Sequence, residues 1–564
     1  MHDDVPGAGL EPVLRGGELT GCRHRLGRRL RGDAPDPGCD PGPWEAAARR
    51  HRAAVLGALP GTTVIADGPD ADLDTLEALA AREPLIVGGV LRQEARGDLP
   101  AEEARPDLLV LLDDAPGAPT YLPVVVAAHK LLRRRGPRGR STPATVLPVG
   151  RLGRPGVLGR NLRSAMAVDQ GRTLRHHVAD AVRAGQAAAL LHNLGLGGGL
   201  VGGIGADADR MIVLDDGPRI AAYRRALRAG RDVANAVAGR PSPLRPGVHP
   251  LAPRRVRECR TCEFADSCTE ELHTIDDISL VLPGDRADRL REEGVGTVRA
   301  LAGQDPRVAG DAVLLARLLV AGLPAALRDG AGPAPRADVE IDVDVEAYPG
   351  HGAYLWGAWD GTRYRAFTAW TAPGAAGADD ALSRAFARFW AWLTARREAA
   401  RDAGLAVRVH CWGAESENHW MRDAARRFGG DRHLDESGRP ITAPSPAEVE
   451  AFLRSPEWAD GQKDARRRLL SAGGLGLKVI APLAGFAWHD PEAGGAGSLP
   501  IFRVAAGADA GEQGAGEQGA DAAAAARELL LRYNADDCRA TAVVRAWLAT
   551  GPDLPTVRDL PRPE

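Results

Sequence analysis

The chain of 564 residues has little lysine, few aromatic residues and almost no net charge. Lysine occurs only at positions 130, 463 and 478, and Phe, Trp and Tyr together make up 4% of the residues. Arginine supplies the remaining positive charge, and with abundant Ala, Gly and Pro this indicates GC-rich codon usage rather than a functional demand. Because the net charge is −3, any contact with nucleic acid must come from local arginine clusters. Candidate clusters are residues 23–31, 133–140 and 466–468, each of which is equally typical of a solvated face.

No uninterrupted apolar run is long enough to cross a bilayer, and the acidic start of the chain lacks a signal-peptide pattern. We therefore expect a cytoplasmic protein with no membrane partner. In a reducing compartment the seven cysteines are not expected to form a disulfide framework. The length allows two or three domains, and 44% hydrophobic with 26% charged residues is typical of a globular protein.

Two short acidic motifs carry most of the functional information. Residues 339–346 alternate between apolar and acidic types, which predicts a strand with Asp344 and Glu346 on one face, about 7 Å apart. Residues 527–548 have helical apolar spacing, and Tyr533 and Asp537 share a helix face because they are four positions apart. Each motif alone is common on a solvated surface. Together they supply the hard oxygen ligands that a two-metal phosphodiesterase needs, and a tyrosine that can orient the attacking water.

A third carboxylate lies between the two motifs. Residues 407–410 predict a short strand, and Glu417 follows it at the start of a predicted helix. With this element in place, residues 336–553 resemble the RNase H-like exonuclease superfamily in its tyrosine-bearing DEDD form. The whole chain resembles a bacterial family of RecB-like nucleases with such a domain at the C-terminus, and the segments that match its pattern are residues 477–479, 485–488 and 533–541.

The resemblance implies a ligand set for two Mg²⁺ or Mn²⁺ ions, and a tyrosine that positions the water. The implied metal ligands are Asp344, Glu346, Glu417 and Asp537, and the implied tyrosine is Tyr533. One departure concerns the second motif of the superfamily, which is normally an aspartate, whereas this chain has Glu417. The longer side chain implies an altered metal geometry. Asp460 is a candidate for an additional acidic partner.

Four cysteines have the spacing of a cofactor site. Cys259 and Cys262 are separated by two residues, Cys268 follows after five more, and Cys22 lies far upstream. Four thiolates can bind an iron–sulfur cluster or a structural zinc ion, and their number does not separate the two metals. Buried apolar thiols are the alternative without a cofactor. One early and three late cysteines resemble the iron–sulfur RecB-like nucleases, which implies a [4Fe–4S] cluster that ties the two ends of the domain together.

The N-terminal half resembles the core of the PD-(D/E)xK nucleases. Residues 105–112 predict a buried strand led by Pro106 and Asp107, and residues 121–130 predict a second strand. In that family an aspartate and a glutamate hold the metal, and a lysine two residues after the glutamate stabilises the transition state. Here Val125 replaces the glutamate and Ala127 replaces the lysine.

The resemblance assigns His51 and Asp107 to a vestigial metal site, and Gln186 to the trailing glutamine of the RecB-like branch. A valine cannot ligate a cation and an alanine carries no charge, so the first interpretation is a nuclease fold that has lost catalysis but kept its scaffold and cluster. The second interpretation is a relocated active site that uses Asp107, His129 and Lys130.

These observations predict an α/β multidomain protein. Residues 1–275 form a RecB-type, restriction-endonuclease-like domain, and residues 336–553 form an RNase H-like mixed-sheet domain. Residues 276–330 form a helical connector, in which Gly294-Val295-Gly296 resembles a helix–hairpin–helix or belongs to an ordinary helical linker. The predicted function is a metal-dependent nuclease, a 3′–5′ exonuclease on DNA or RNA, with a helicase as a candidate partner. The alternative is a non-catalytic nucleic-acid-binding or scaffolding protein.

Overall fold

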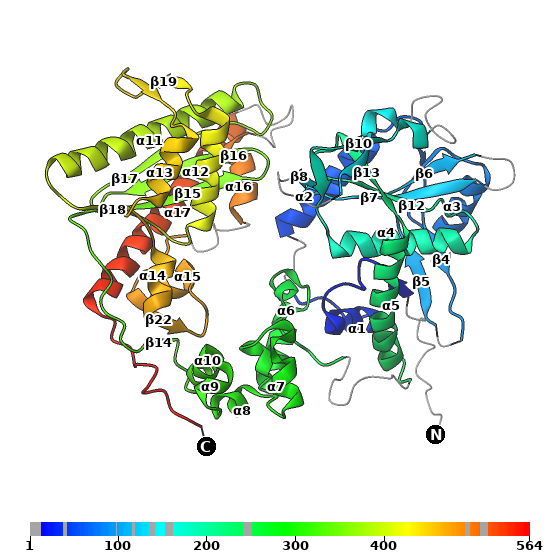
Figure 1. Ribbon diagram of the computed structural model, residues 1–564, viewed down its shortest axis with the longest axis horizontal. Coiled ribbons are helices and arrows are strands. Elements are labelled where there is room, and N and C mark those ends of the chain that lie inside the picture. Colours follow the sequence, from blue (N-terminus) through cyan, green and yellow to red (C-terminus); the bar gives the residue numbers. More distant parts are fainter. Residues whose placement is uncertain are drawn as a thin grey trace. The chain divides into compact units, whose positions relative to one another are not determined.

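The computed structural model divides the chain into two compact units, Met1–Gly294 and Val295–Glu564 (Figure 1). The boundary falls inside the predicted connector. On either side of it, α7 (Asp288–Glu292) and α8 (Val298–Ala302) flank Gly294, whose φ of +85° is readily adopted only by glycine. The structure describes residues 13–37, 42–97, 99–114, 119–135, 142–152, 162–240, 251–490, 497–507 and 517–563.

The first unit is built on an eight-stranded mixed sheet in the order β10-β9-β13-β12-β7-β6-β3-β2, with smaller sheets β1-β5-β4 and β11-β8. Its strands are β1 (Val13–Arg15), β2 (Thr63–Val64), β3 (Leu85–Val87), β4 (Leu91–Gln93), β5 (Ala101–Ala104), β6 (Leu108–Asp113), β7 (Thr120–Val126), β8 (Leu132–Arg134), β9 (Ala144–Pro148), β10 (Ala167–Asp169), β11 (Arg172–Leu174), β12 (Leu200–Ile204) and β13 (Arg210–Asp215). Besides α7, its helices are α1 (Arg23–Arg31), α2 (Gly42–Gly57), α3 (Ala71–Ala80), α4 (Val178–Asn193), α5 (Gly217–Val237) and α6 (Ala265–Thr274), with short 3-10 turns η1 (Val149–Arg151), η3 (Arg163–Ala165), η4 (Arg257–Thr261), η5 (Ile278–Leu280) and η6 (Gly284–Ala287).

The central strands β6 and β7 are continuous apolar runs rather than alternating ones, as expected for strands that are covered on both faces. They pair antiparallel with Leu108 opposite Val124, so the backbone N–H of Asp107 donates to the Val124 carbonyl at 3.0 Å. Both predicted strands are present, but the expected extension of the second to residue 130 is wrong. β7 ends at Val126, so His129 and Lys130 belong to the following loop.

The second unit contains a five-stranded mixed sheet in the order β17-β16-β15-β18-β21. β17, β16 and β15 are antiparallel, whereas β15, β18 and β21 are parallel. Its strands are β14 (Ala325–Leu327), β15 (Val339–Tyr348), β16 (Gly352–Trp359), β17 (Tyr364–Thr368), β18 (Val407–Cys411), β19 (Arg432–Leu434), β20 (Pro440–Thr442), β21 (Trp458–Asp460) and β22 (Leu469–Ser471). Besides α8, its helices are α9 (Pro306–Ala309), α10 (Asp311–Val320), α11 (Ala378–Asp402), α12 (Glu415–Phe428), α13 (Pro446–Arg454), α14 (Gly461–Arg468), α15 (Leu477–Ile480), α16 (Ser498–Ala505) and α17 (Glu517–Thr550), with the 3-10 turn η7 (Ala481–Ala484).

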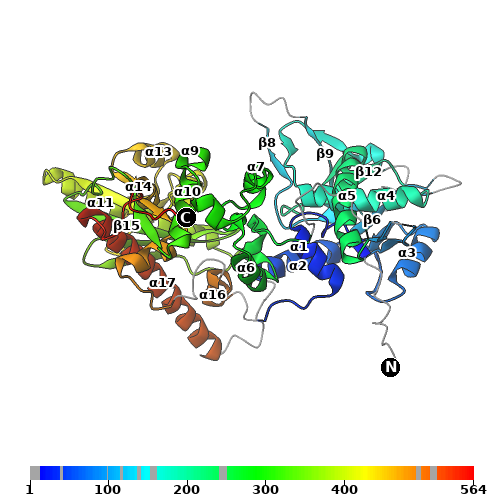
Figure 2. The same cartoon turned by 90° about the horizontal axis from the view of Figure 1, so that it is seen from below.

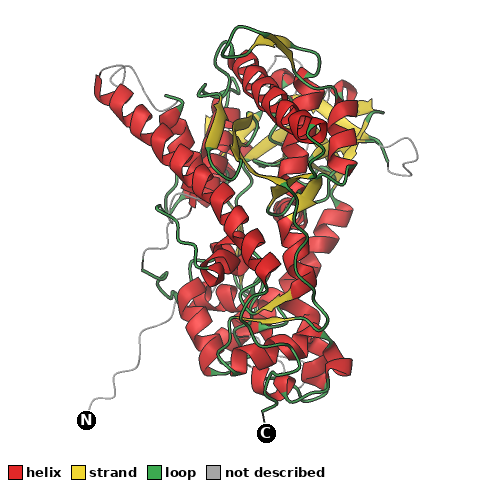
Figure 3. Ribbon diagram, turned by 90° about the vertical axis from the view of Figure 1, so that its left-hand side faces the viewer, coloured by secondary structure: helices red, strands yellow, loops and turns green. Residues whose placement is uncertain are grey.

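The five-stranded sheet lies between α11 and the long helix α17, which are labelled in Figure 2. Figure 3 shows the strands in yellow among the helices in red. Trp356 on β16 stacks on Phe389 of α11 with ring centroids 5.2 Å apart. The next residue, Gly357, faces Asn534 of α17, because successive strand residues point to opposite faces. α17 buries residues at helical spacing along this face, namely Leu530, Tyr533, Asn534, Cys538, Thr541, Val544 and Leu548.

Within the part of the chain that the structure describes, no helix is both long enough and apolar enough to cross a membrane.

Candidate metal centre

Three carboxylates of the second unit meet at one point. Asp344 and Glu346 on β15 and Asp537 on α17 each place one carboxylate oxygen within 4.8 Å of the other two. The alternation of β15 puts the first two on the same face of the sheet, and α17 crosses that face. Two motifs almost two hundred positions apart in sequence therefore form one acidic cluster, which we call the carboxylate centre.

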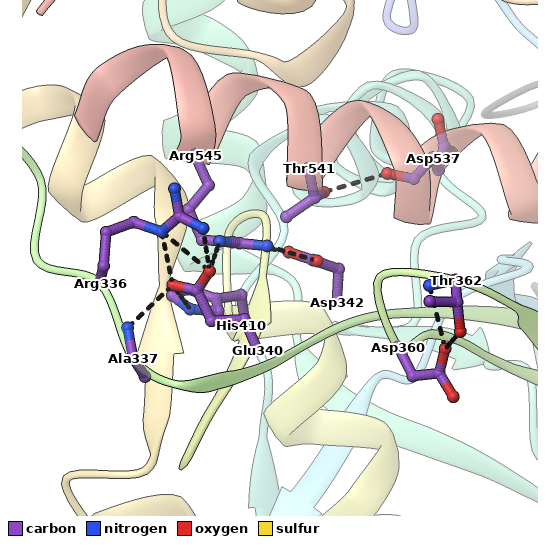
Figure 4. A network of polar contacts seen from close by, with 10 residues as sticks. All are labelled: Arg336, Ala337, Glu340, Asp342, Asp360, Thr362, His410, Asp537, Thr541 and Arg545. Carbon is purple, nitrogen blue, oxygen red and sulfur yellow. Dashed lines mark hydrogen bonds and ion pairs between the residues drawn. The ribbon is translucent and has the colours of Figure 1, made fainter. Parts of the chain in front are cut away.

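A buried ion-pair network holds α17 against β15 beside this centre (Figure 4). The Arg545 guanidinium pairs with Asp342 at 3.0 Å and also with Glu340, and both acids are on β15. Asp342 is fully buried, and burial raises its pKa to about 6 even though Arg545 lies beside it. Arg545 is eight residues, or about two helical turns, beyond Asp537. The network therefore fixes the position of α17 along β15, and with it the position of Asp537 beside the strand.

Asn534 orients Asp344 directly. Its Nδ2 donates to Asp344 Oδ2 at 2.6 Å, and its Oδ1 accepts from the Tyr364 hydroxyl at 2.7 Å. The amide fits only because Gly357, which pairs with Asp344 on the neighbouring strand, has no side chain. A β-carbon at position 357 would overlap Asn534 Oδ1 and lie 2.8 Å from its Cγ.

Burial is the main cause of the raised pKa values of the three carboxylates. Burial and the charge of Asp537 raise the pKa of Glu346 to about 8. Burial, with Asp537 and Glu346 nearby, raises the pKa of Asp344 well above its ordinary value. Burial also raises the pKa of Asp537 to about 6, against the opposing effect of hydrogen bonds from Trp488 and Tyr533. The raised pKa values mean that ionising all three acids is energetically unfavourable. A bound cation would stabilise the ionised forms.

A tyrosine, a tryptophan and a lysine border the centre. Tyr533, one turn before Asp537 on α17, is 4% exposed, and burial raises the pKa of its hydroxyl so that it stays protonated at neutral pH. Trp488 Nε1 donates to Asp537 Oδ1 at 2.7 Å. Lys478 Nζ lies 5.1 Å from the centroid of the Tyr533 ring, and its charge lowers the pKa values of Glu346 and Asp537.

Glu417 on α12 belongs to the surroundings of the centre but not to the group within 4.8 Å. It is 5% exposed, its Oε2 is buried without a hydrogen-bond partner, and burial raises its pKa to about 7. Its charge raises the pKa values of Asp344 and Glu346. Asp460 instead caps α14, where it accepts from the backbone N–H groups of the first turn.

The four predicted cysteines gather in the first unit. Cys22 lies at the N-cap of α1, Cys259 lies in η4, Cys262 follows it, and Cys268 lies in α6. The charge of Cys22 raises the pKa values of Cys262 and Cys268, and that of Cys259 acts on Cys22, so the thiols are electrostatic neighbours. Burial is the main cause of each raised pKa, which reaches about 11 for Cys268. Among the described residues, no three cysteine sulfurs lie within 4.8 Å of one another, whereas thiolates around tetrahedral zinc are about 3.8 Å apart.

Two arginines pair with Asp107, which the sequence assigned to a vestigial metal site. Asp107 is 7% exposed and pairs with Arg52 of α2 at 2.9 Å and with Arg183 of α4 at 3.2 Å. The backbone N–H of Val126 also donates to it at 2.7 Å. His51, next to Arg52, has a buried Nε2 without a hydrogen-bond partner. Two guanidinium groups thus occupy the place where a cation would neutralise Asp107.

The other residues singled out in this half have separate environments. Val125 packs in an apolar cluster with side chains of α4, and Ala127 lies in another one. Gln186 accepts from the Gly16 N–H at 2.6 Å and donates to the Leu14 carbonyl at 2.9 Å, which ties α4 to the first strand. Lys130 Nζ lies 3.8 Å from Asp207. Asp107 and Lys130 therefore have different ion-pair partners.

Parts of two arginine clusters are paired within the chain. Arg28 bonds Asp33 at 3.0 Å, and Arg468 lies 3.5 Å from Asp464. Residues 136–140 of the remaining cluster lie outside the described residues. The paired arginines therefore contribute less positive surface than the sequence alone indicates.

Sequence reasoning missed several residues that shape the carboxylate centre. Asn534 and Trp488 lie within motifs that carried the resemblance, but neither was given a role. A polar residue at an apolar position of α17 was the available signal for Asn534. Arg545 lies on the same helix face as Asp537, yet its acidic partners on β15 could not be identified before the strand and helix were in contact.

No protein-family model matches this chain, and neither a curated protein nor a solved structure matches it. The function therefore has to be inferred from the geometry of its sites.

Proposed function

We propose that the second unit is a metal-dependent nuclease, a 3′–5′ exonuclease of the RNase H-like, tyrosine-bearing type. The observation that carries the proposal is the carboxylate centre, in which three acids lie within 4.8 Å of one another and have raised pKa values. Such crowding destabilises the ionised protein unless cations neutralise it. The mixed five-stranded sheet that presents two of these acids also supports the proposal.

The donor set fits Mg²⁺ or Mn²⁺, because these ions prefer carboxylate oxygen to nitrogen or sulfur. Asp344, Glu346 and Asp537 would hold the metal, with Glu417 as the fourth carboxylate. The orphaned, buried Oε2 of Glu417 supports this assignment, since a buried polar atom without a partner is costly unless a ligand satisfies it. When bound, two such ions supply charge stabilisation to the attacking and leaving oxygens of an in-line displacement.

The surrounding residues would orient the reacting groups. The protonated Tyr533 hydroxyl donates to Asp537, and its oxygen can accept a hydrogen bond from a water molecule and so position it beside Asp537. Lys478 adds a positive charge near the centre, suited to a phosphate oxygen. Asn534 and Trp488 each donate to a metal-binding carboxylate, which holds it in one rotamer.

For the first unit, we propose a RecB-type nuclease fold that binds nucleic acid without cleaving it. Its support is the arginine pair on Asp107 and the apolar packing of Val125 and Ala127. The gathered thiols would hold a [4Fe–4S] cluster, with zinc as the alternative. The raised pKa values of Cys22, Cys262 and Cys268 mean that cofactor binding releases protons.

Digestion of 3′- and 5′-labelled single strands with Mn²⁺ tests the nuclease. We expect Asp344→Ala and Asp537→Ala each to lower the rate by several orders of magnitude while nucleic-acid binding survives, because loss of one carboxylate uncouples the ions from the phosphate. Tyr533→Phe should cost less, roughly ten- to a thousandfold, because it disturbs water positioning alone. Glu528→Ala is the matched control, since Glu528 is an acid on the solvated face of α17 with its side chain 75% exposed. Full activity in the Asp344→Ala/Asp537→Ala double variant would refute the nuclease and leave a non-catalytic scaffold in its place.

Anaerobic purification tests the cofactor independently. An iron–sulfur cluster gives a brown protein through thiolate-to-iron charge transfer, and Cys262→Ser should lose the colour. Cys411→Ala should keep it, because Cys411 is buried in the second unit. A colourless protein with stoichiometric zinc that depends on Cys262 would establish zinc instead.

A further inference from the structure

A second group of potential metal ligands lies in the first unit, away from its cysteines. His129 follows β7, His177 immediately precedes α4, and Asp180 lies in the first turn of that helix. One ligand atom from each lies within 4.8 Å of the other two. His129 Nε2 is 2.8 Å from Asp180 Oδ2, and the two imidazole rings have centroids 3.8 Å apart.

The hydrogen bonding of His177 prepares it to bind a cation. Its Nε2 is buried and has no hydrogen-bond partner. The backbone of Lys130 is a further polar neighbour of the ring. A buried imidazole nitrogen without a hydrogen-bond partner, beside a second imidazole and a carboxylate, is the arrangement that a metal ion would satisfy.

The group is distinct from the vestigial nuclease site. Asp107 already has two arginine partners and is not part of it. His177 and Asp180 instead line a pocket with an empty volume of about 460 Å³. The pocket wall combines apolar side chains with Arg175 and Arg219. A ligand held by the three residues would therefore keep a side that faces the pocket.

We infer that His129, His177 and Asp180 form a binding site for a divalent transition-metal ion of the zinc class. Two imidazole nitrogens and one carboxylate select such ions over Mg²⁺ and Ca²⁺, which prefer oxygen ligands alone. Three protein ligands leave a fourth position, as in zinc sites that exchange a water or a small anion. The site satisfies the orphaned His177 nitrogen and links the loop after β7 to the start of α4.

Titration of the full-length protein with Co²⁺, followed by displacement with Zn²⁺, tests the site. The titration contains excess Mg²⁺, which saturates sites made of oxygen ligands. The visible spectrum of the bound Co²⁺ then reports whether nitrogen coordinates it. We expect one equivalent of Co²⁺ to bind the wild type, and its affinity to fall at least about tenfold in His177→Ala and Asp180→Ala. His176→Ala is the matched control and should retain the equivalent, because the adjacent His176 is exposed and outside the group.

Two further variants keep the result decisive. His129→Ala alters a loop residue whose side chain is 44% exposed, so it should fold even where a change at position 177 does not, and it should lose the same equivalent. Cys262→Ser should retain it, which separates the site from the cysteine cofactor. Equal Co²⁺ binding by the wild type and His129→Ala would overturn the inference, as would loss of the equivalent in Cys262→Ser but not in His129→Ala.

Discussion

Adding one methyl group at Gly357 should disable the carboxylate centre. The new β-carbon would overlap Asn534 Oδ1 and lie 2.8 Å from its Cγ and 3.1 Å from Cε2 of Tyr364. Gly357 is buried, and Asn534 is fully buried. Its side chain must therefore move, and it then loses its hydrogen bonds to Asp344 and Tyr364.

The expected cost has two parts. Overpacking a core position costs about 1–3 kcal/mol. A buried polar group without its partner costs a further ~1–3 kcal/mol. We expect Gly357→Ala to lower the free energy of unfolding by about 2–4 kcal/mol in urea denaturation, because partial relaxation offsets some of the sum. Nuclease activity should fall about 10–100-fold, since Asp344 loses the group that orients it.

Two comparisons isolate the cause. Gly332→Ala places a β-carbon in open space in the same unit, and its effect should stay within about 0.5 kcal/mol. Asn534→Ala removes the obstacle, so adding Gly357→Ala to it should cost little more than Asn534→Ala alone, a strong departure from additivity. If Gly357→Ala has wild-type stability, or if the two substitutions add, the proposed contact does not control the centre.

Three further outcomes follow from the same structure. Arg545→Met leaves the fully buried Asp342 without its arginine partner and should cost about 3–5 kcal/mol in urea denaturation, whereas Arg558→Met, at a surface ion pair, should cost less than about 1 kcal/mol. Because burial raises the pKa of Glu346 from 4.5 to about 8, the folded protein binds this proton more tightly than the unfolded chain. The stability of the metal-free protein should therefore fall as the pH rises between those values, and Glu346→Gln should flatten the slope; an unchanged slope contradicts the assignment. Asp107→Ala should leave nuclease activity unchanged, and a loss of cleavage there would reverse the proposed roles of the two units.

The two units differ in how they neutralise a buried aspartate. In the first, Arg52 and Arg183 pair with Asp107 permanently, so the carboxylate has its countercharge without a ligand. In the second, Asp344 has an amide donor and two acidic neighbours but no arginine is bonded to it among the described contacts. Only the second arrangement leaves carboxylates whose negative charge a metal ion can neutralise, and for this reason we propose that catalysis takes place there.

Local pattern was sufficient for the elements that carry the candidate residues. The alternation at 339–346 predicted a strand with Asp344 and Glu346 on one face, and the spacing around Tyr533 and Asp537 predicted a helix; the structure confirms both elements. The sequence predicts that β7 continues past its observed end, because apolar residues 127 and 128 extend the pattern. In the structure the last residue of β7 in the sheet register is Val126. A buried loop and a buried strand both give an apolar run in the sequence, and only the backbone pairing of the strand distinguishes the two.

By itself, the sequence determined which residues could share a face, because strand and helix periodicity are properties of the backbone. Only the tertiary structure decided which faces meet. Asn534 reaches Asp344 because Gly357 leaves room on the adjacent strand, and His177 meets His129 because α4 starts beside the loop after β7. The first of these contacts joins residues 190 positions apart. Distance along the chain carries no information about them until the sheet register and helix packing bring the residues together.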